Sequence, residues 1–490
     1  MDDDDIATYI GWKGYTIYKK NISVQEQQML RKELNVKPFV PKSSLSKPQP
    51  FPVYRESKNK IYVPIFYGME VYGEPDEIRI DDGKKINVSF KGELRPKQKP
   101  VVKKFMKHIK KKNSGLLALH TGFGKTCLAL NIISKIKLKT IIIVHKEFLL
   151  RQWVERIEQF LPDAKVGKIQ AKTIDTEGKD IVICMLQSLS MKEYPKDMFR
   201  EYGFSIYDEV HHLGAEVFSK AFYKVVTKYS LGLSATINRK DGLTKVIKWF
   251  LGDVVCKLER KGEDNVLVKV INYETTDEDF NKIETDWRGQ IKYTTMVKKL
   301  CEFNNRSEFI LKVLSDLLKG NPNQQIMILA HQKKLLQYLH DAIRHRTIAT
   351  VGYYVGGMKE KDLKISEGKK VIIATYAMAE EGLDIKSLTT LIMATPKVDV
   401  RQSVGRILRQ KHNEAVVVDI VDSHSLFQRH FTKRKTFYRK SKFKVIQTNM
   451  NGYQNGDWET IYDPINKIKK AFSKTKNEDK LLQGVCLIGN

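Results

Sequence analysis

A glycine-rich segment, HTGFGKT (120–126), has the residue types that most directly suggest chemistry in this chain. It follows a short apolar run, LLAL (116–119), and precedes a helical pattern, which is the context of a phosphate-binding loop. Lys125 is expected to contact the β- and γ-phosphates of ATP, and the Thr126 hydroxyl to ligate Mg²⁺. The predicted ATP-binding residues of the loop are Leu119, His120, Thr121, Gly122, Phe123, Gly124, Lys125 and Thr126.

This loop departs from the general phosphate-loop pattern at one position. The pattern GxxxxGK[ST] requires glycine where the chain has Leu119, whereas the TGxGKT part is present. For the segment taken alone, the alternative is a glycine-rich turn that opens a helix without binding phosphate.

Two adjacent carboxylates, Asp208 and Glu209, end a second apolar run within FSIYDEVHH (204–212). Open parallel sheets bind ligands at the carboxyl ends of their strands, so both side chains are expected at such a crevice. We predict that Asp208 holds Mg²⁺, directly or through water, and that Glu209 polarises the attacking water as general base. His211 is expected to link this strand end to neighbouring polar groups. The alternatives are an acidic loop or a histidine-rich zinc site, although no third zinc ligand is evident.

The elements that must position these residues are short apolar runs alternating with helical patterns. This alternation predicts an α/β fold with parallel sheets covered on both faces. The expected strands are residues 116–119, 140–145, 180–186, 204–209, 229–235, 324–330, 369–376, 389–396 and 415–421. Segments 61–73 and 86–90 are also expected to be strands. We divide the chain into an accessory region (1–90), a first α/β domain (91–260), a linker (261–300), a second α/β domain (301–440) and a polar, basic tail (441–490).

The charge balance favours a polyanionic partner. Eighty-six Lys and Arg against 57 Asp and Glu give a net charge of +29, which promotes binding to nucleic acid by counterion release; a merely lysine-rich surface is the alternative. The five cysteines contain no CxxC pair, which favours a reducing compartment. No apolar run has the length of a membrane span, and the acidic start lacks a secretion signal. We therefore expect a soluble intracellular protein, in the host cytoplasm or virion if it is viral.

The order of these motifs resembles that of superfamily 2 helicases with a DEAD/DEAH-like box. HTGFGKT, DEVH (208–211) and SAT (234–236) are similar to motifs I, II and III, and EEGLDI (380–385) and QSVGRILRQ (402–410) to motifs V and VI. The resemblance implies two tandem RecA-like P-loop domains, with a small N-terminal accessory domain and ATP bound between the two. LLRQW (149–153) and SATINRKDG (234–242) resemble the branch of the xeroderma-type transcription/repair helicase, the phage branch-migration helicase and the poxvirus transcript-release helicase. Residues 51–68 resemble helicases of large nucleocytoplasmic DNA viruses.

The resemblance also implies roles for individual residues. Arg95 and Gln98, in ELRPKQ (93–98), are similar to an adenine-reading element. His211, Ser234 and Thr236 couple hydrolysis to domain movement, and Gly382 and Asp384 contact ribose or sense the state of the track. Gln402 touches the γ-phosphate region or His211. Arg406 and Arg409 act as arginine fingers, since guanidinium groups stabilise charge in phosphoryl transfer. Two ordinary surface arginines are the alternative for motif VI alone.

Superfamily 2 helicases hold their track mainly by its backbone. The candidate nucleic-acid contacts are Lys146, Arg151, Gln187, Ser188 and Thr375. The basic segment 429–444 interleaves Lys and Arg with Phe431, Phe437, Tyr438 and Phe443, which stack on bases in one interpretation and pack onto the second domain in the other.

The function implied is an ATP-dependent, Mg²⁺-requiring helicase or translocase that moves on DNA in viral transcription, repair or replication. We expect nucleic acid as the partner, with DNA favoured over RNA, and transcription or replication machinery as a further partner of a monomeric protein. The alternatives are a duplex translocase or transcript-release factor that does not separate strands, the motor subunit of a restriction-type nuclease, and a non-catalytic scaffold. No nuclease cluster is evident, and intact Lys125, Asp208 and Glu209 argue against a scaffold.

Overall fold

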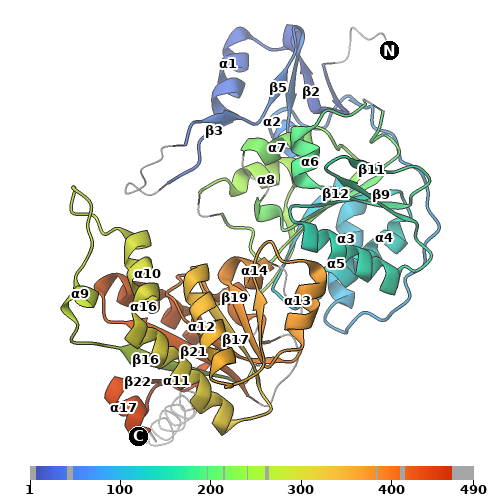
Figure 1. Ribbon diagram of the computed structural model, residues 1–490. Helices are drawn as coiled ribbons and strands as arrows, with labels where there is room; N and C mark the ends of the chain where they lie inside the picture. The colour runs from blue at the N-terminus through green and yellow to red at the C-terminus, as the bar shows by residue number, and fades with distance from the viewer. Residues whose placement is uncertain are drawn as a thin grey trace, which may run out of the picture. The chain divides into compact units, whose positions relative to one another are not determined.

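The computed structural model describes residues 7–40, 48–195, 197–212, 216–239, 241–259, 264–381, 385–408 and 414–465. The chain divides into two compact units, Met1–Glu259 (unit 1) and Arg260–Asn490 (unit 2). Each contains one large parallel sheet with helices on both faces (Figure 1). The predicted α/β class with tandem parallel sheets is therefore confirmed.

Unit 1 contains an eight-stranded sheet in the order β11-β10-β12-β9-β13-β14-β8-β15. All neighbours are parallel except β10 and β11. The strands are β8 (Ser114–Leu119), β9 (Thr140–Val144), β10 (Val166–Gln170), β11 (Thr173–Asp175), β12 (Ile181–Met185), β13 (Phe204–Asp208), β14 (Tyr229–Ser234) and β15 (Val254–Leu258). The apolar runs of the central strands β8, β9, β12 and β13 are buried on both faces, as parallel strands require.

Two separate cores cover the faces of this sheet. One is built with α3 (Lys99–Lys112), α4 (Lys125–Ile136) and α5 (Glu147–Phe160). The other includes residues of α6 (Leu186–Met191), α7 (Glu216–Phe222) and α8 (Thr244–Leu251).

The accessory region has a sheet of its own but shares the second of these cores. Its strands are β1 (Thr8–Gly11), β2 (Gly14–Tyr18), β5 (Arg55–Glu56), β6 (Lys60–Val63) and β7 (Glu77–Ile78), in the order β5-β6-β2-β1-β7, beside a separate pair, β3 (Asn35–Val36) and β4 (Phe51–Pro52). The Tyr67 ring meets Trp249 of α8 edge-on at 5.2 Å. Tyr223 donates a hydrogen bond of 2.6 Å to the carbonyl of Val53. The region therefore covers one face of unit 1.

Of the two strands expected in the accessory region, the one at 61–73 is right only for residues 61–63, and the one at 86–90 is wrong. Residues 61–73 form the end of β6 and then α2 (Ile65–Tyr72), because Pro64 stops the ladder and starts the helix. Residues 86–90 form no strand; the segment crosses unit 1 with Ile86 and Val88 buried in the core. The helix α1 (Val24–Glu33) begins with a capping box between Ser23 and Glu26.

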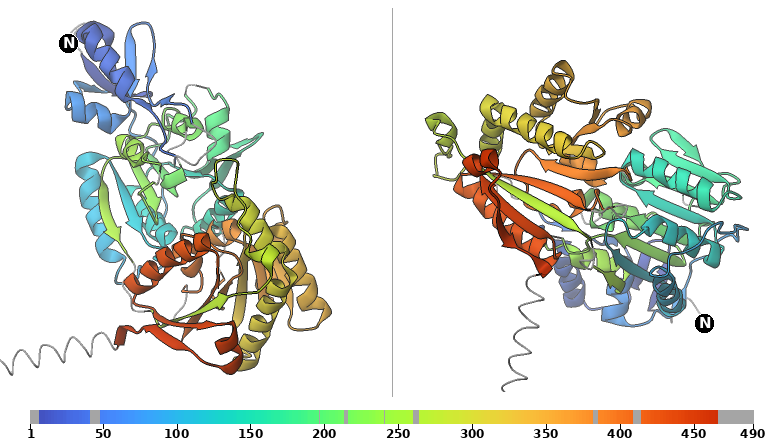
Figure 2. Two further views of the ribbon diagram at one scale, coloured as in Figure 1. Left: turned by 90° about the vertical axis from the view of Figure 1, so that its left-hand side faces the viewer. Right: turned by 90° about the horizontal axis from the view of Figure 1, so that it is seen from below.

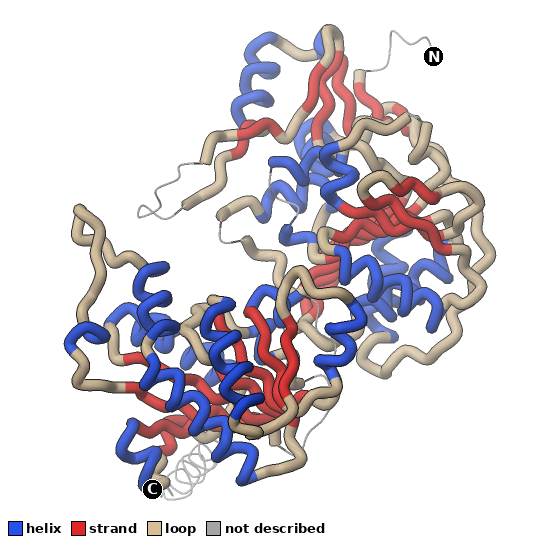
Figure 3. The backbone as a smooth tube through the Cα atoms, in the orientation of Figure 1, coloured by secondary structure: helices blue, strands red, loops and turns tan. Residues whose placement is uncertain are grey.

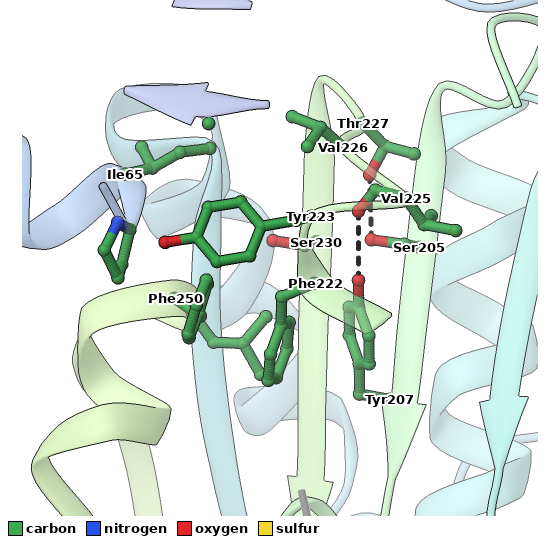
Figure 4. A pocket seen from close by; sticks show the side chains of 13 residues that line it. Ile65, Ser205, Tyr207, Phe222, Tyr223, Val225, Val226, Thr227, Ser230 and Phe250 are labelled. Atoms are coloured by element: carbon green, nitrogen blue, oxygen red, sulfur yellow. Dashed lines mark hydrogen bonds between the residues drawn. The ribbon is translucent and has the colours of Figure 1, made fainter. Parts of the chain in front are cut away.

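A small cavity of about 30 Å³ lies at the seam between the accessory region and the large sheet (Figure 4). Tyr223, Phe222 and Phe250 line it beside Ile65. Near it, Thr227 donates to Ser205 Oγ at 2.8 Å and Tyr207 donates to the Val225 carbonyl at 3.2 Å. A volume of this size holds a water molecule or two, so it does not serve as a nucleotide site.

Unit 2 repeats the eight-stranded plan in the order β18-β19-β17-β20-β21-β16-β22-β23. Only the β22–β23 pair is antiparallel. The strands are β16 (Val266–Tyr273), β17 (Gln325–Ala330), β18 (Val351–Tyr354), β19 (Val371–Thr375), β20 (Leu388–Met393), β21 (Ala415–Asp422), β22 (Lys444–Asn449) and β23 (Glu459–Tyr462).

The helices of unit 2 lie on both faces of its sheet (Figure 2), and their apolar side chains form two cores. One core includes α10 (Tyr293–Glu302), α11 (Asn304–Gly320), α12 (Lys333–His345) and α17 (Met450–Asn455); the other includes residues of α14 (Tyr376–Glu381), α15 (Arg401–Val404) and α16 (Ser425–Lys440). The short α9 (Glu278–Asn281) and α13 (Glu360–Glu367) complete the set of helices in the described residues. None of the helices in the described part of the chain is long and apolar enough to cross a membrane.

The linker expected at 261–300 and the tail expected at 441–490 are both wrong in part. β16 lies inside the sheet, paired with β21 on one side and β22 on the other. β22 and β23 extend the same sheet beyond residue 441. β16 is buried but is flanked by polar residues, so segment 261–300 is polar on average. This polarity led to the incorrect prediction of a linker.

The basic segment 429–444 belongs to the core of unit 2 rather than to a base-stacking surface. Phe431, Tyr438 and Phe443 are buried, and Phe437 packs against the same cluster. Arg434, 1% exposed, forms a two-pronged ion pair with Asp419 of β21 at 2.8 and 2.9 Å. The interpretation in which these aromatics pack onto the second domain is the one that the structure supports.

Candidate functional site

The phosphate loop connects β8 to α4 through two glycines with left-handed backbones. Gly122 has φ of 83° and Gly124 has φ of 90°, values that glycine adopts without strain. A Cβ at residue 124 would lie 2.5 Å from Nε2 of Gln98. Residue 124 therefore requires glycine for two reasons: its backbone has a positive φ, and a Cβ would clash with the Gln98 side chain.

The upstream element predicted to read adenine lies against this loop. Gln98 is 2% exposed; its Nε2 donates to the Phe123 carbonyl at 2.8 Å, and its Oε1 accepts from the Arg95 amide at 2.9 Å. Arg95 Nη1 also donates to the Gly122 carbonyl at 3.4 Å. Both side chains thus brace the loop, while their contact with adenine stays a prediction.

Lys125, the first residue of α4, contacts Glu209 directly. Its Nζ donates to Glu209 Oε1 at 2.7 Å, and the two side chains are 15% and 21% exposed. Glu209 has φ of 49°, in the left-handed region, which is unusual for a residue with a side chain and is often found at functional sites. The structure therefore brings the phosphate-loop lysine and the predicted general base together from residues 84 apart in the chain.

Asp208, at the end of β13, is buried behind this pair. Its Oδ2 accepts a hydrogen bond from Trp153 Nε1 at 3.0 Å, and its Oδ1 accepts from the Glu209 amide at 3.0 Å. Burial, followed by the charge of Glu209, raises the pKa of Asp208 to about 6, against the opposing effects of Lys125 and Trp153. The indole N–H thus fixes the orientation of the predicted Mg²⁺ ligand.

Trp153 was not predicted as a site residue, although the LLRQW segment that contains it was noted. It lies on α5 and is 1% exposed. From sequence, a tryptophan on the apolar face of a helix indicates only packing. Its role as a hydrogen-bond donor to Asp208 becomes apparent only in the structure, where α5 lies beside the end of β13.

His211 links the carboxylate strand to the end of β14. Its Nδ1 lies 3.0 Å from Ser234 Oγ and 3.4 Å from Glu209 Oε2. Ser234 donates to the Thr236 carbonyl at 2.7 Å and accepts from the Thr236 amide at 3.2 Å. Burial is the main cause that lowers the pKa of His211, which favours a neutral ring. Arg239, which sequence reasoning missed as a site residue, donates to the His211 carbonyl.

Oxygen donors at this place suit Mg²⁺ rather than a soft metal. Thr126 and Asp208 supply a hydroxyl and a carboxylate, the ligand types that Mg²⁺ prefers, and the loop with its positive-φ glycines fits a phosphate chain. Within the described ranges, no group of three His, Cys, Asp or Glu side chains is arranged to hold a metal by itself. His212 of the zinc alternative has a side chain outside the described residues.

The candidate nucleic-acid contacts of unit 1 gather at the ends of the neighbouring strands β9 and β12. Gln187 Nε2 donates to the His145 carbonyl at 2.7 Å, beside Lys146. Arg151, further along α5, pairs with Glu147 at 2.5 Å, and Ser188 Oγ accepts from the Ala171 amide at 2.9 Å. Burial lowers the pKa of Lys146 and, with the charge of Lys146, lowers that of His145 to about 4.

In unit 2, motif V and motif VI are joined by Glu380. Its Oε1 accepts from Ser403 Oγ at 3.0 Å, and its backbone carbonyl accepts from Arg406 Nη2. Arg406 is 6% exposed, and Gln402 lies on α15. Thr375, a candidate track contact, ends β19, where its Oγ1 accepts from the Met378 amide at 3.4 Å. The predicted residues Gly382, Asp384 and Arg409 lie outside the described residues.

Comparisons with known proteins agree with the two-unit division of these motifs. Residues 91–239 match the family described as "Type III restriction enzyme, res subunit", and residues 310–411 match "Helicase conserved C-terminal domain". "Putative ATP-dependent RNA helicase L396" of Acanthamoeba polyphaga mimivirus is 35% identical over 456 residues, 90% of this chain and 87% of that protein. "Putative helicase 161L" of Invertebrate iridescent virus 6 is 28% identical over 72% of this chain and 83% of that protein.

Two further matches are more distant. "Putative ATP-dependent RNA helicase QP509L" of African swine fever virus (isolate Pig/Kenya/KEN-50/1950) is 27% identical over 73% of this chain and 75% of that protein. The solved structure of T4 UvsW aligns over 90% of this chain and 99% of that chain, with 16% identity and a TM-score of 0.35; so low a score does not bear on the arrangement of the domains.

These matches identify the class of protein. The chain belongs to the superfamily 2 helicases, in the group whose relatives occur in large DNA viruses. The order of its motifs predicted this family.

Proposed function

We propose that this protein hydrolyses ATP in response to nucleic acid and uses the energy to move along DNA. The observation that carries the proposal is the contact between Lys125 and Glu209, at 2.7 Å, directly in front of the buried Asp208. A lysine, a general base and a metal-binding carboxylate at the mouth of a phosphate loop are the parts that phosphoryl transfer to water requires.

Each residue of unit 1 has a defined task in this proposal. Thr126 and Asp208 would hold Mg²⁺, which would neutralise charge on the phosphates when bound. The γ-phosphate takes the Lys125 ammonium as its partner, and this releases the Glu209 carboxylate. Glu209 then accepts a proton from the water whose oxygen bonds to the γ-phosphorus, while the bond from that phosphorus to the bridging oxygen breaks. ADP and phosphate leave, and the proton passes to solvent.

Roles for the residues of unit 2 are proposed from their resemblance to helicase motifs V and VI. Gln402 and Arg406 are proposed to act on the γ-phosphate, with Arg409 as a second finger and with Gly382 and Asp384 at the ribose or the track. His211, Ser234 and Thr236 would transmit the change from the carboxylate strand to β14. The hydrogen bond between His211 and Ser234 supports this coupling, because it joins the two strand ends.

DNA is the proposed track, held by Lys146, Arg151, Gln187, Ser188 and Thr375. RNA is the second candidate, because two of the viral relatives are named RNA helicases. The net charge of +29 favours either polyanion. A role in viral transcription or replication, as a monomer, is the corresponding proposal for its place in the cell.

The test is the ATPase rate of the full chain with single-stranded DNA, duplex DNA, forked DNA and RNA. We expect stimulation by nucleic acid and its loss in Lys125→Ala and Glu209→Gln. Lys135→Ala is the matched control, because Lys135 is an exposed lysine of the same helix α4. Wild-type turnover that is independent of every nucleic acid would overturn the proposal, whereas stimulation by RNA alone would change the track.

A further inference from the structure

Unit 2 carries an exposed tryptophan at the tip of a projecting loop. Residues 284–292, here the hairpin loop, connect α9 to α10 and extend away from the helices of unit 2 (Figures 1 and 3). Trp287 in this loop is 84% exposed. By contrast, Trp153 and Trp249 of unit 1 are 1% and 8% exposed. Leaving so large an apolar ring in water forgoes its burial energy, so the ring is available for a partner.

The loop holds this ring on a firm backbone. Thr285 and Ile291 form an antiparallel bridge. Oδ1 of Asp286 accepts from the amides of Arg288 and Gln290 at 2.9 and 2.8 Å. The Asp286 amide donates to the Gln290 carbonyl at 2.8 Å, and the Gly289 amide donates to the Asp286 carbonyl at 3.0 Å. Gly289 takes the positive φ of 73° that the turn needs.

The base of the hairpin loop is fixed to α10. The Lys292 amide donates to the Glu284 carbonyl at 2.9 Å. Lys299 of α10 donates to the carbonyls of Asp279 and Lys282, each at 2.8 Å, and to Glu284 Oε1 at 3.1 Å. This hydrogen bond is the main cause that lowers the pKa of Glu284. The tip is therefore presented in one conformation, which reduces the entropy lost when a partner binds.

The charges of the hairpin loop favour an anionic partner. Arg288 and Lys292 are exposed, as is Lys282 two residues before the loop. Asp286 and Glu284 are half-buried and already bonded, Asp286 to loop amides and Glu284 to Lys299 of α10. The Arg288 guanidinium lies over the Trp287 ring, 4.2 Å from its centroid. An exposed aromatic ring beside a cation is a combination that binds single-stranded nucleic acid, where bases stack on the ring and phosphates pair with the cation.

We propose that Trp287 stacks on a base of single-stranded nucleic acid, with Arg288, Lys282 and Lys292 attracting the backbone on either side. This inference rests on the proposed function, since it assigns a contact to the track of that motor. The other predicted contacts bind the sugar-phosphate backbone of the nucleic acid, so Trp287 would add a contact to a base. A protein segment could also take an exposed tryptophan, but the Arg288 guanidinium against the ring and the exposed Lys282 and Lys292 nearby in the chain favour nucleic acid.

The direct test uses the fluorescence of Trp287 in the full-length protein. The chain has five tryptophans, so the difference between wild type and Trp287→Phe isolates the signal of residue 287. We expect oligo(dT) to quench this difference signal. An oligonucleotide of the same length with abasic sites has the same phosphates without bases, and it should leave the signal unquenched. Equal quenching by both would overturn the stacking proposal.

Affinity measurements give a second, independent result. Trp287→Ala should weaken binding to oligo(dT) roughly 5- to 150-fold, the range expected for the loss of one base–aromatic stack. Trp287→Phe keeps a ring and should lose less. Phe39→Ala is the matched control, since it removes another exposed aromatic, 67% exposed, from unit 1. Melting temperatures should be unchanged in all three, because the altered residues are exposed.

The outcomes separate this inference from the proposed function. ATP turnover stimulated by nucleic acid, with equal affinity in wild type and Trp287→Ala, would overturn the stacking contact and leave the motor intact. Quenching by oligo(dT) without any stimulated turnover would support the contact and overturn the motor. Retained DNA affinity in Trp287→Ala with loss of a protein partner would assign the tip to that partner instead.

Discussion

The two units contain sheets of the same plan but use their strand carboxylates in opposite ways. In unit 1, Glu209 follows the end of β13 and meets Lys125, and both side chains remain partly exposed, at 21% and 15%. In unit 2, Asp419 and Asp422 lie on β21 and pair with Arg434 and Arg306 at no more than 1% exposure. A pair that is open to water can exchange one partner for a ligand. A pair that is sealed in the core can only hold helices to the sheet.

The buried pair Arg434–Asp419 should therefore give the largest effect on stability. Arg434→Met leaves a buried carboxylate with Tyr438 as its remaining side-chain donor, at 2.9 Å. Breaking one side of such a pair costs about 3–5 kcal/mol. We expect calorimetry to show a lower melting temperature for unit 2, with the transition of unit 1 unchanged.

The matched control for this prediction replaces both partners. Arg434→Met with Asp419→Leu removes the charge as well as its partner, and should recover much of the lost stability. A single variant as stable as wild type would show that the pair contributes nothing, and the contrast between the units would fail.

Trp153→Phe should affect chemistry in unit 1 more than stability. The change removes the N–H that orients Asp208 and keeps an aromatic ring in the core. Loss of a residue that orients a metal ligand typically weakens metal binding about 10- to 100-fold. We expect a corresponding rise in the Mg²⁺ concentration for half-maximal ATPase activity. Trp249→Phe, at another buried tryptophan of unit 1, should leave this concentration unchanged; equal shifts in both would argue for packing alone.

Gly68→Ala should destabilise unit 1 by an intermediate amount. Alanine favours a helix, but a Cβ at residue 68 of α2 would lie 2.2 Å from Cγ of Tyr15. Overpacking of this kind costs about 1–3 kcal/mol. Gly320→Ala at the end of α11 in unit 2 has open space around its Cβ and should be neutral or stabilising. Chemical denaturation of both variants distinguishes tight packing from helix propensity; similar stability of the two would contradict the close contact.

The smallest effect is expected at the surface pair of Glu308 and Arg346. The pair is close, at 2.6 Å, but its side chains are 42% and 47% exposed. Exposed pairs contribute little to stability, so Glu308→Gln should leave the free energy of unfolding, measured by chemical denaturation, close to that of wild type. A loss as large as that of Arg434→Met would remove the distinction between open and sealed pairs.

The sequence predicted those parts of the molecule that depend on neighbouring residues. The β8–loop–α4 unit and the strand that ends in Asp208 follow from short apolar runs and local motifs. β16 was missed because its place in the sheet is decided by β21 and β22, far along the chain. Trp153 was missed for the same reason, since its indole meets Asp208 across 55 residues. In α16, composition left both a base-stacking surface and a packed helix face open, and in the structure Arg434, Phe431 and Tyr438 lie on the buried face.

The core shared by the accessory region and unit 1 also affects how the protein folds during synthesis. Val53 accepts its hydrogen bond from Tyr223, 170 residues further along the chain. At about 5–20 residues per second, the ribosome needs roughly 10–30 seconds to make that stretch. During this time the apolar side of the accessory region, including Tyr67 of α2, remains uncovered by α8. The nascent chain therefore passes through an interval in which this surface is open to chaperones or to self-association, and that interval ends when Trp249 and Phe250 emerge.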